Sequence, residues 1–134
     1  MVDEEIAKYL NDQNVGTYNK SGADLFVGTM KPPSTHIPVK SAWILPSGGP
    51  APEHVFGHAY NIRQPTVQIL VRGGAYKESR DFAQSIYNAL NGASPTGLWP
   101  ILPMQSEPVW VGPDENNNFI WSINLLVRYK QTAT

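Results

Sequence analysis

The sequence contains no cysteine among its 134 residues. Disulfide bonds, thiolate-bound zinc and cysteine nucleophiles are therefore excluded, and packing alone must hold the core together. Long hydrophobic runs are also missing, because apolar stretches such as residues 69–71 and 125–127 are far shorter than the roughly 18 residues of a membrane helix. The acidic N-terminus is unlike a signal peptide. We therefore expect a soluble protein of the cytoplasm, or of a particle assembled there, without membrane contact.

Charge is scarce as well. Charged residues make up 16% of the chain, and ten Lys plus Arg against eleven Asp plus Glu leave a formal net charge of −1. Sequence-specific nucleic-acid binding is not expected, because no cluster of basic residues is present to attract the phosphate backbone. A surface so poor in charge is typical of a subunit whose faces are covered by copies of itself or by partners.

The chain nevertheless carries 41% hydrophobic residues, which lie in periodic segments, so disorder is excluded. Its length predicts one domain that spans residues 1–134. Apolar periodicity predicts a helix at the N-terminus and a second one over 75–90, and strands over 24–30, 39–45, 66–72, 98–104, 107–111 and 119–130. Residues 46–65, rich in Pro and Gly, are expected to form a long loop, and residues 112–118 a polar turn.

These elements show no regular alternation of strand and helix. The predicted fold class is therefore α+β, with an antiparallel or mixed sheet of about five to six strands and both helices packed on one face. In the second helix, the spacing predicts a buried arc opposite Gln84 that is formed by Ser79, Phe82, Ala83, Ile86, Ala89 and Leu90. In the strand at 66–72, Val67, Ile69 and Val71 are expected to share one face. In the last strand, the side chains expected to share the inward face are Phe119, Trp121, Ile123, Leu125, Val127 and Tyr129.

The sequence offers little that could carry chemistry. His54 and His58 stand four residues apart, as the ligands of a helical zinc site do, but the prolines before them and Gly57 between them oppose a helix. Residues 72–74 lack the pattern of a phosphate-binding loop. We therefore predict no catalytic residue, no metal site and no cofactor. Two alternatives stay open: a glycan-binding module that uses Trp43, Phe56 and Tyr60, and, less favoured, a metal-dependent enzyme that uses the two histidines.

Four segments, in order along the chain, resemble the minor capsid and tail-terminator proteins of tailed bacteriophages, which act in tail completion and head–tail joining. They are DLFVGTM at 24–30, TVQILVRGGAY at 66–76, IYNAL at 86–90 and VGPDE at 111–115, the last followed by a long strand. The resemblance implies a structural protein without catalytic residues, located in the tail or neck of the virion and assembled in the host cytoplasm.

The same resemblance implies a ring, commonly a hexamer, that caps the finished tail tube and faces the neck of the head. Its partners would be copies of itself, the tail tube protein and a neck or head-completion protein, with the genome passing through the lumen. Ring contacts are expected on the helix-free side of the sheet and in the loops at 46–65 and 112–118. The candidate interface residues are Trp43, Phe56, Tyr60, Arg63, Asp114 and Glu115.

Overall fold

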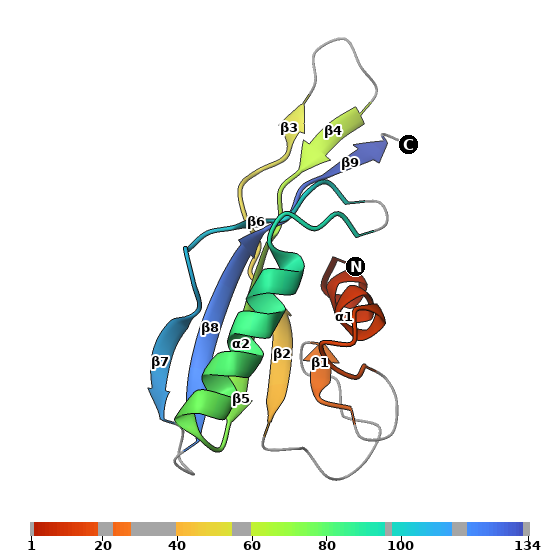
Figure 1. Cartoon of the computed structure of the whole chain (residues 1–134). Helices are drawn as coiled ribbons and strands as arrows, with labels where there is room; N and C mark the ends of the chain where they lie inside the picture. Colours follow the sequence, from red (N-terminus) through yellow and green to blue (C-terminus); the bar gives the residue numbers. More distant parts are fainter. Residues whose placement is uncertain are drawn as a thin grey trace.

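The computed structural model describes residues 2–18, 23–27, 40–54, 60–95, 98–113 and 118–132. The elements follow the order α1 (Val2–Asp12), β1 (Leu25–Val27), β2 (Ser41–Pro46), β3 (Glu53–His54), β4 (Tyr60–Arg63), β5 (Thr66–Gly73), α2 (Tyr76–Leu90), β6 (Leu102–Pro103), β7 (Val109–Pro113), β8 (Phe119–Leu126) and β9 (Tyr129–Thr132) (Figure 1). They form a mixed six-stranded sheet and a small three-stranded sheet, which confirms the predicted α+β class.

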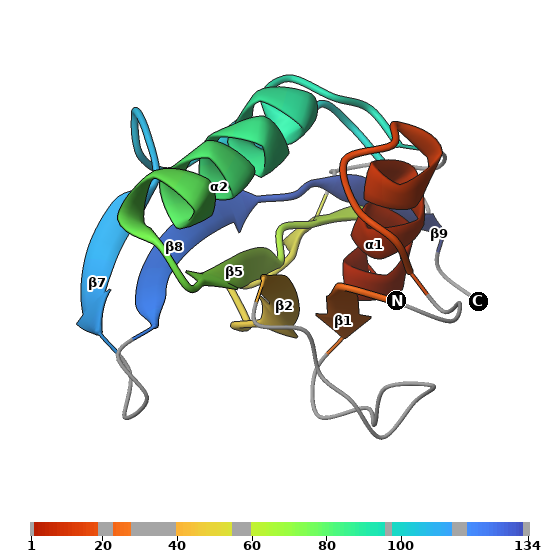
Figure 2. The ribbon, with the colours of Figure 1, turned by 60° about the horizontal axis from the view of Figure 1, so that its bottom comes forward.

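The six-stranded sheet is built around the antiparallel pair of β5 and β8. Its order is β1-β2-β5-β8-β6, and β7 also pairs with β8. Among the strand pairs described in this sheet, β1 and β2 are the only parallel one. Burial alternates along β5, where Val67, Ile69 and Val71 are buried and the residues between them are half-buried, as the sequence predicts. Both helices lie on the face to which these three side chains point (Figure 2).

Helix α2 covers the centre of the sheet with the predicted apolar arc. Ser79, Phe82, Ala83, Ile86 and Leu90 are all buried, and Ala89 is half-buried. The helix can lie close to β5 because Gly73 has no side chain: a Cβ atom there would sit 2.7 Å from the Cβ of Ser79. The Ser79 hydroxyl donates to the carbonyl of Tyr76 at 2.9 Å and accepts the indole N–H of Trp121, also at 2.9 Å.

Helix α1 packs against β1 and β2 beside α2. Ile6, Ala7 and Leu10 are fully buried, and Val2 and Tyr9 are partly buried against the same core. An isolated helix of this length is marginal in water, so packing on the sheet is what sustains it. Neither described helix has the length and apolar character needed to cross a membrane.

The structure corrects two predicted elements. The expected loop at 46–65 contains β3 and β4, which pair with each other and, through β4, with β9 to form the three-stranded sheet. The expected single strand at 119–130 is two strands, because β8 ends in the large sheet and β9 begins in the small one. Long-range pairing decides both outcomes, since strands of two to four residues carry almost no periodic signal of their own.

Other strand boundaries also differ from the prediction: β2, for example, begins at residue 41 and ends at residue 46 instead of spanning 39–45. The expected edge strand at 98–104 is reduced to β6, and β7 extends through Pro113 instead of ending at residue 111. The first strand is described only over β1, since residues 28–30 lie outside the described residues.

Trp121 provides a test of the inward face of β8. It is only 6% exposed, and its indole N–H has a buried partner, so we expect Trp121→Ala to lower the free energy of unfolding by roughly 3–5 kcal/mol. Gln84→Ala on the outer side of α2 is the control and should stay within about 0.5 kcal/mol. Urea unfolding measures both. Equal losses would contradict the assigned faces.

Candidate assembly surfaces

Exposed apolar side chains gather along one edge of the six-stranded sheet. β6 and β7 both pair with β8, so together they form this edge. Five large apolar residues along it are between 48% and 61% exposed, and we call them the edge patch: Leu102, Met104, Val109, Trp110 and Val111. In the described part of the chain, only two other large apolar side chains, Tyr76 and Trp99, are classed as exposed. Such a concentration marks an interaction surface.

The backbone of this edge is poorly suited to pairing with a further strand. The register with β8 shifts between Trp110 and Gly112, which is the signature of a β-bulge. Pro113 has no N–H group to donate. Both features are known ways of protecting an edge strand from continued pairing. The edge patch therefore offers side chains, more than backbone groups, to a partner.

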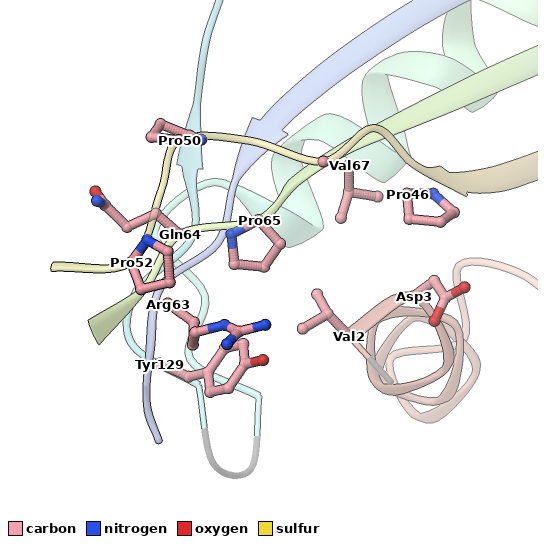
Figure 3. A pocket seen from close by; sticks show the side chains of 11 residues that line it. Val2, Asp3, Pro46, Pro50, Pro52, Arg63, Gln64, Pro65, Val67 and Tyr129 are labelled. Carbon is pink, nitrogen blue, oxygen red and sulfur yellow. The ribbon is translucent and has the colours of Figure 1, made fainter. Parts of the chain in front are cut away.

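A cavity of about 310 Å³ lies between the start of α1 and the junction of the two sheets (Figure 3). We call it the proline cavity, because four prolines contribute to its wall: Pro46, Pro50 and Pro52 from the end of β2 and the loop after it, and Pro65 from the turn between β4 and β5. The remaining lining residues are Val2, Asp3, Gly48, Arg63, Gln64, Val67 and Tyr129. In Figure 3, Arg63 and Tyr129 lie on one side of the cavity, and Val2 and Asp3 of α1 lie on another.

Hydrogen bonds hold the loop that forms the outer wall of the cavity. The backbone N–H of Ser47 donates to the carbonyl of Thr66 at 2.8 Å, and the two side-chain hydroxyls are also 2.8 Å apart. The N–H of Thr66 in turn donates to the carbonyl of Gly48 at 3.3 Å. The side chain of Gln64 donates to the carbonyl of Ala51 at 3.4 Å. Since proline also fixes its own backbone angle, this wall is held in shape by the chain itself.

The cavity has an acidic wall and a basic wall. Asp3 is 7% exposed, and its carboxylate accepts the N–H of Glu4 at 3.0 Å. Nearby, burial raises the pKa of the Tyr18 phenol above its ordinary value, and the carboxylates of Glu4 and Asp3 add to the rise. Arg63 contributes positive charge from β4 on the opposite side. A ligand of this cavity can thus combine apolar contacts with an interaction with either the Asp3 carboxylate or the Arg63 guanidinium.

The small sheet next to the cavity carries further cations. Arg128 forms an ion pair with Glu53 at 3.1 Å and lies 5.3 Å from the ring centre of Trp99. Lys130 lies 4.1 Å from the ring centre of Tyr60. These contacts join Arg128, which precedes β9, to β3 and to the segment before β6, and they join β9 to β4.

Of the three predicted interface residues that the structure describes, two lie on the same strand. Tyr60 and Arg63 lie on β4, both half-buried. Trp43 is half-buried on the helix-free face of the large sheet, where its ring stacks on Phe26 at 4.6 Å. Trp43 and Tyr60 therefore belong to different sheets and do not share one strand face, as a common aromatic groove would require. The other three predicted residues, Phe56, Asp114 and Glu115, lie outside the described residues.

Sequence reasoning missed both the edge patch and the proline cavity. Val109, Trp110 and Val111 are consecutive and apolar, a pattern that usually indicates burial, yet all three are exposed. The available signal was the absence of charge from residues 108–113, which is unusual for an edge strand. The four prolines of the cavity were interpreted only as loop punctuation.

The histidine pair is only partly described. His54 is exposed on β3, whereas His58 lies outside the described residues. The adjacent Glu53 is paired with Arg128. Within the described ranges, no three His, Asp or Glu side chains are grouped so that they could hold a metal ion.

Gly49 tests how firmly the outer wall is held. Its φ is +100°, and a Cβ atom there would collide with the backbone carbonyl of Gln64 and the N–H of Thr66. Gly48, with φ +88°, has no atom within 4 Å of such a Cβ. We expect Gly48→Ala to cost about 1–2 kcal/mol from its backbone conformation, and Gly49→Ala about 1–3 kcal/mol more. Thermal unfolding of both variants checks this. Equal melting temperatures would show that the backbone at Gln64 and Thr66 can move to accommodate the added methyl group.

Comparison with known proteins assigns the fold to a family. A family model described as bacteriophage tail terminator protein matches residues 9–131, which run from within α1 to within β9. A search of curated proteins gives no match. The resemblance carried by the four sequence segments is therefore confirmed at the level of the family. The chain belongs to the bacteriophage tail terminator family and is a structural, non-enzymatic protein of the virion tail.

Proposed function

We propose that this protein forms a closed ring, most simply of six subunits, that ends the tail tube and joins it to the head at the neck. The observation that carries the proposal is the family match over residues 9–131. In this role, residues 1–134 act as one tail-terminator-like domain and no cofactor takes part.

The distribution of the two surfaces supports a ring. β7, which carries three residues of the edge patch, lies at one side of the molecule, whereas α1, which borders the proline cavity, lies at the other side (Figures 1 and 2). β6 lies closer to the junction of the two sheets (Figure 1). Unlike surfaces at opposite sides favour head-to-tail contacts, which close into rings when the rotation between subunits allows it. A symmetric dimer would instead need a single self-complementary surface.

The remaining faces are available to the other proposed partners. We propose that one rim of the ring contacts the tail tube protein and the other a neck or head-completion protein, with the genome passing through the lumen. Trp43, Tyr60 and Arg63 are half-buried in the described subunit and lie on faces that such partners could cover. Assembly would take place in the host cytoplasm.

Deleting the gene from a phage that carries it tests this role. We expect full heads and separate tails, some of irregular length, because nothing would end the tube or join it to the neck. Electron microscopy of lysates measures the fraction of joined particles, and supplying the protein in trans should restore it. Normally joined particles without the protein would refute the proposal, as would its absence from purified virions.

A further inference from the structure

We propose that Trp110 of one subunit inserts into the proline cavity of the next, so that the edge patch and the cavity are the two halves of the subunit contact. This inference rests on the proposed ring and names the surfaces that build it. Trp110 is 54% exposed and is the second residue of β7, so its indole is free to enter a partner.

The chemistry of the cavity fits an indole ring. The flat apolar faces of Pro46, Pro50, Pro52 and Pro65, together with Val67 and Tyr129, provide the packing surface that an aromatic ring needs. The guanidinium of Arg63 is attracted to the face of an indole, and the carboxylate of Asp3 can accept its N–H. A tryptophan in a preformed, largely apolar pocket is the typical centre of a protein interface.

The occupant must come from another molecule, because β7 and α1 lie at opposite sides of the same subunit (Figures 1 and 2). Charge favours a second copy of this chain. The only charged residue in 105–113 is the exposed Glu107. Beside the cavity, β3, β4, β9 and Arg128 carry three cations against one anion, whereas the first turn of α1 on the other side carries Asp3, Glu4 and Glu5. When the edge of one copy docks at the cavity of another, Glu107 is therefore attracted to the wall formed by the small sheet and repelled by α1, which helps to orient the two subunits.

The rest of the edge patch completes the contact. A stable interface buries roughly 800 Å² on each partner, more than one tryptophan can supply. Leu102, Met104, Val109 and Val111 lie along the same edge and are about half exposed. Val109 alternates with Trp110 along β7, so it projects to the opposite face of the strand, and together with Val111 at the bulge it adds contact area beside the inserted ring. Since the bulge and Pro113 oppose strand pairing at this edge, side chains provide the association.

A disulfide experiment tests the geometry, since the natural chain has no cysteine. Val111→Cys places a thiol on the edge patch, and Pro50→Cys places one at the exposed rim of the cavity. Phage tails that carry the double variant should give, on mild oxidation, a ladder of covalent multimers that ends at the size of the ring. Each single variant should give at most dimers, and Val111→Cys with Asn88→Cys, on the exposed side of α2, should give no ladder.

The outcomes separate this contact from the ring itself. Rings seen by negative stain on tails of the double variant, with no more multimer than in the Asn88 control, would refute the contact and leave the ring in place. If the double variant fails to join heads and tails, Pro52→Cys, also exposed on the cavity wall, replaces Pro50→Cys.

Substitution of Trp110 gives an independent readout. Trp110→Ser should reduce incorporation into tails at least about tenfold, whereas the free subunit should keep its melting temperature because this side chain is exposed. Trp110→Phe, which retains an aromatic ring, should recover most of the incorporation. Wild-type incorporation of Trp110→Ser would refute the proposal, and a large fall in its melting temperature would show that Trp110 instead supports the subunit fold.

Discussion

The antiparallel pairing of β5 and β8 is the interaction on which the rest of the structure depends. Its register runs from Thr66 opposite Leu126 to Gly73 opposite Phe119. The inward side chains of both strands are buried beneath α2, and a shift of one residue would turn all of them toward the opposite face. The register is therefore fixed by burial. Once it is set, β2 lies on one side of the pair, and β6 and β7 lie on the other, where the edge patch forms.

A second constraint acts where the two central strands leave the large sheet. Gln64 and Pro65 connect β4 to β5, and Val127 and Arg128 connect β8 to β9. These two connections pass side by side from one sheet to the other. The N–H of Val127 donates to the carbonyl of Pro65 at 2.9 Å and ties the two crossings together. Val127 is fully buried, whereas Arg128 turns outward to Glu53 and Trp99. This crossing brings Arg63 and Tyr129 to the proline cavity.

These two constraints explain how a subunit of this size can present two unlike surfaces. An apolar edge strand is ordinarily a hazard, because it invites uncontrolled association. Here the bulge and Pro113 limit strand pairing. The low content of charged residues is typical of protein surfaces that are buried in contacts with other subunits. A pocket built from prolines loses little conformational entropy when it is filled, since its wall is already fixed. Together, these features support the proposed head-to-tail association of subunits.

Periodicity determined the parts of the structure in which burial is regular. Most of the inward residues of α2, β5 and β8 were predicted, because each element is long enough for repeated apolar spacing to identify one side. Phe119 is only half-buried, Tyr129 belongs to β9, and the burial of Tyr87 was not predicted. The α+β class followed from these elements, and the family followed from four quoted segments. Of the six predicted interface residues, Trp43, Tyr60 and Arg63 were located, and Phe56, Asp114 and Glu115 stay predictions outside the described residues.

Tertiary structure alone decided the small sheet, the edge patch and the proline cavity. β3 and β4 are strands because β4 pairs with β9, almost seventy residues away. The local sequence of β4 does not indicate such a distant partner. The apolar run at 109–111 is exposed because β8 already has its inner neighbour, so β7 is left at the edge. The four prolines meet only after β2, β4 and β5 have folded together. Sequence periodicity reports which side of an element is buried, whereas only the assembled chain determines which edges remain uncovered and which distant residues enclose a space.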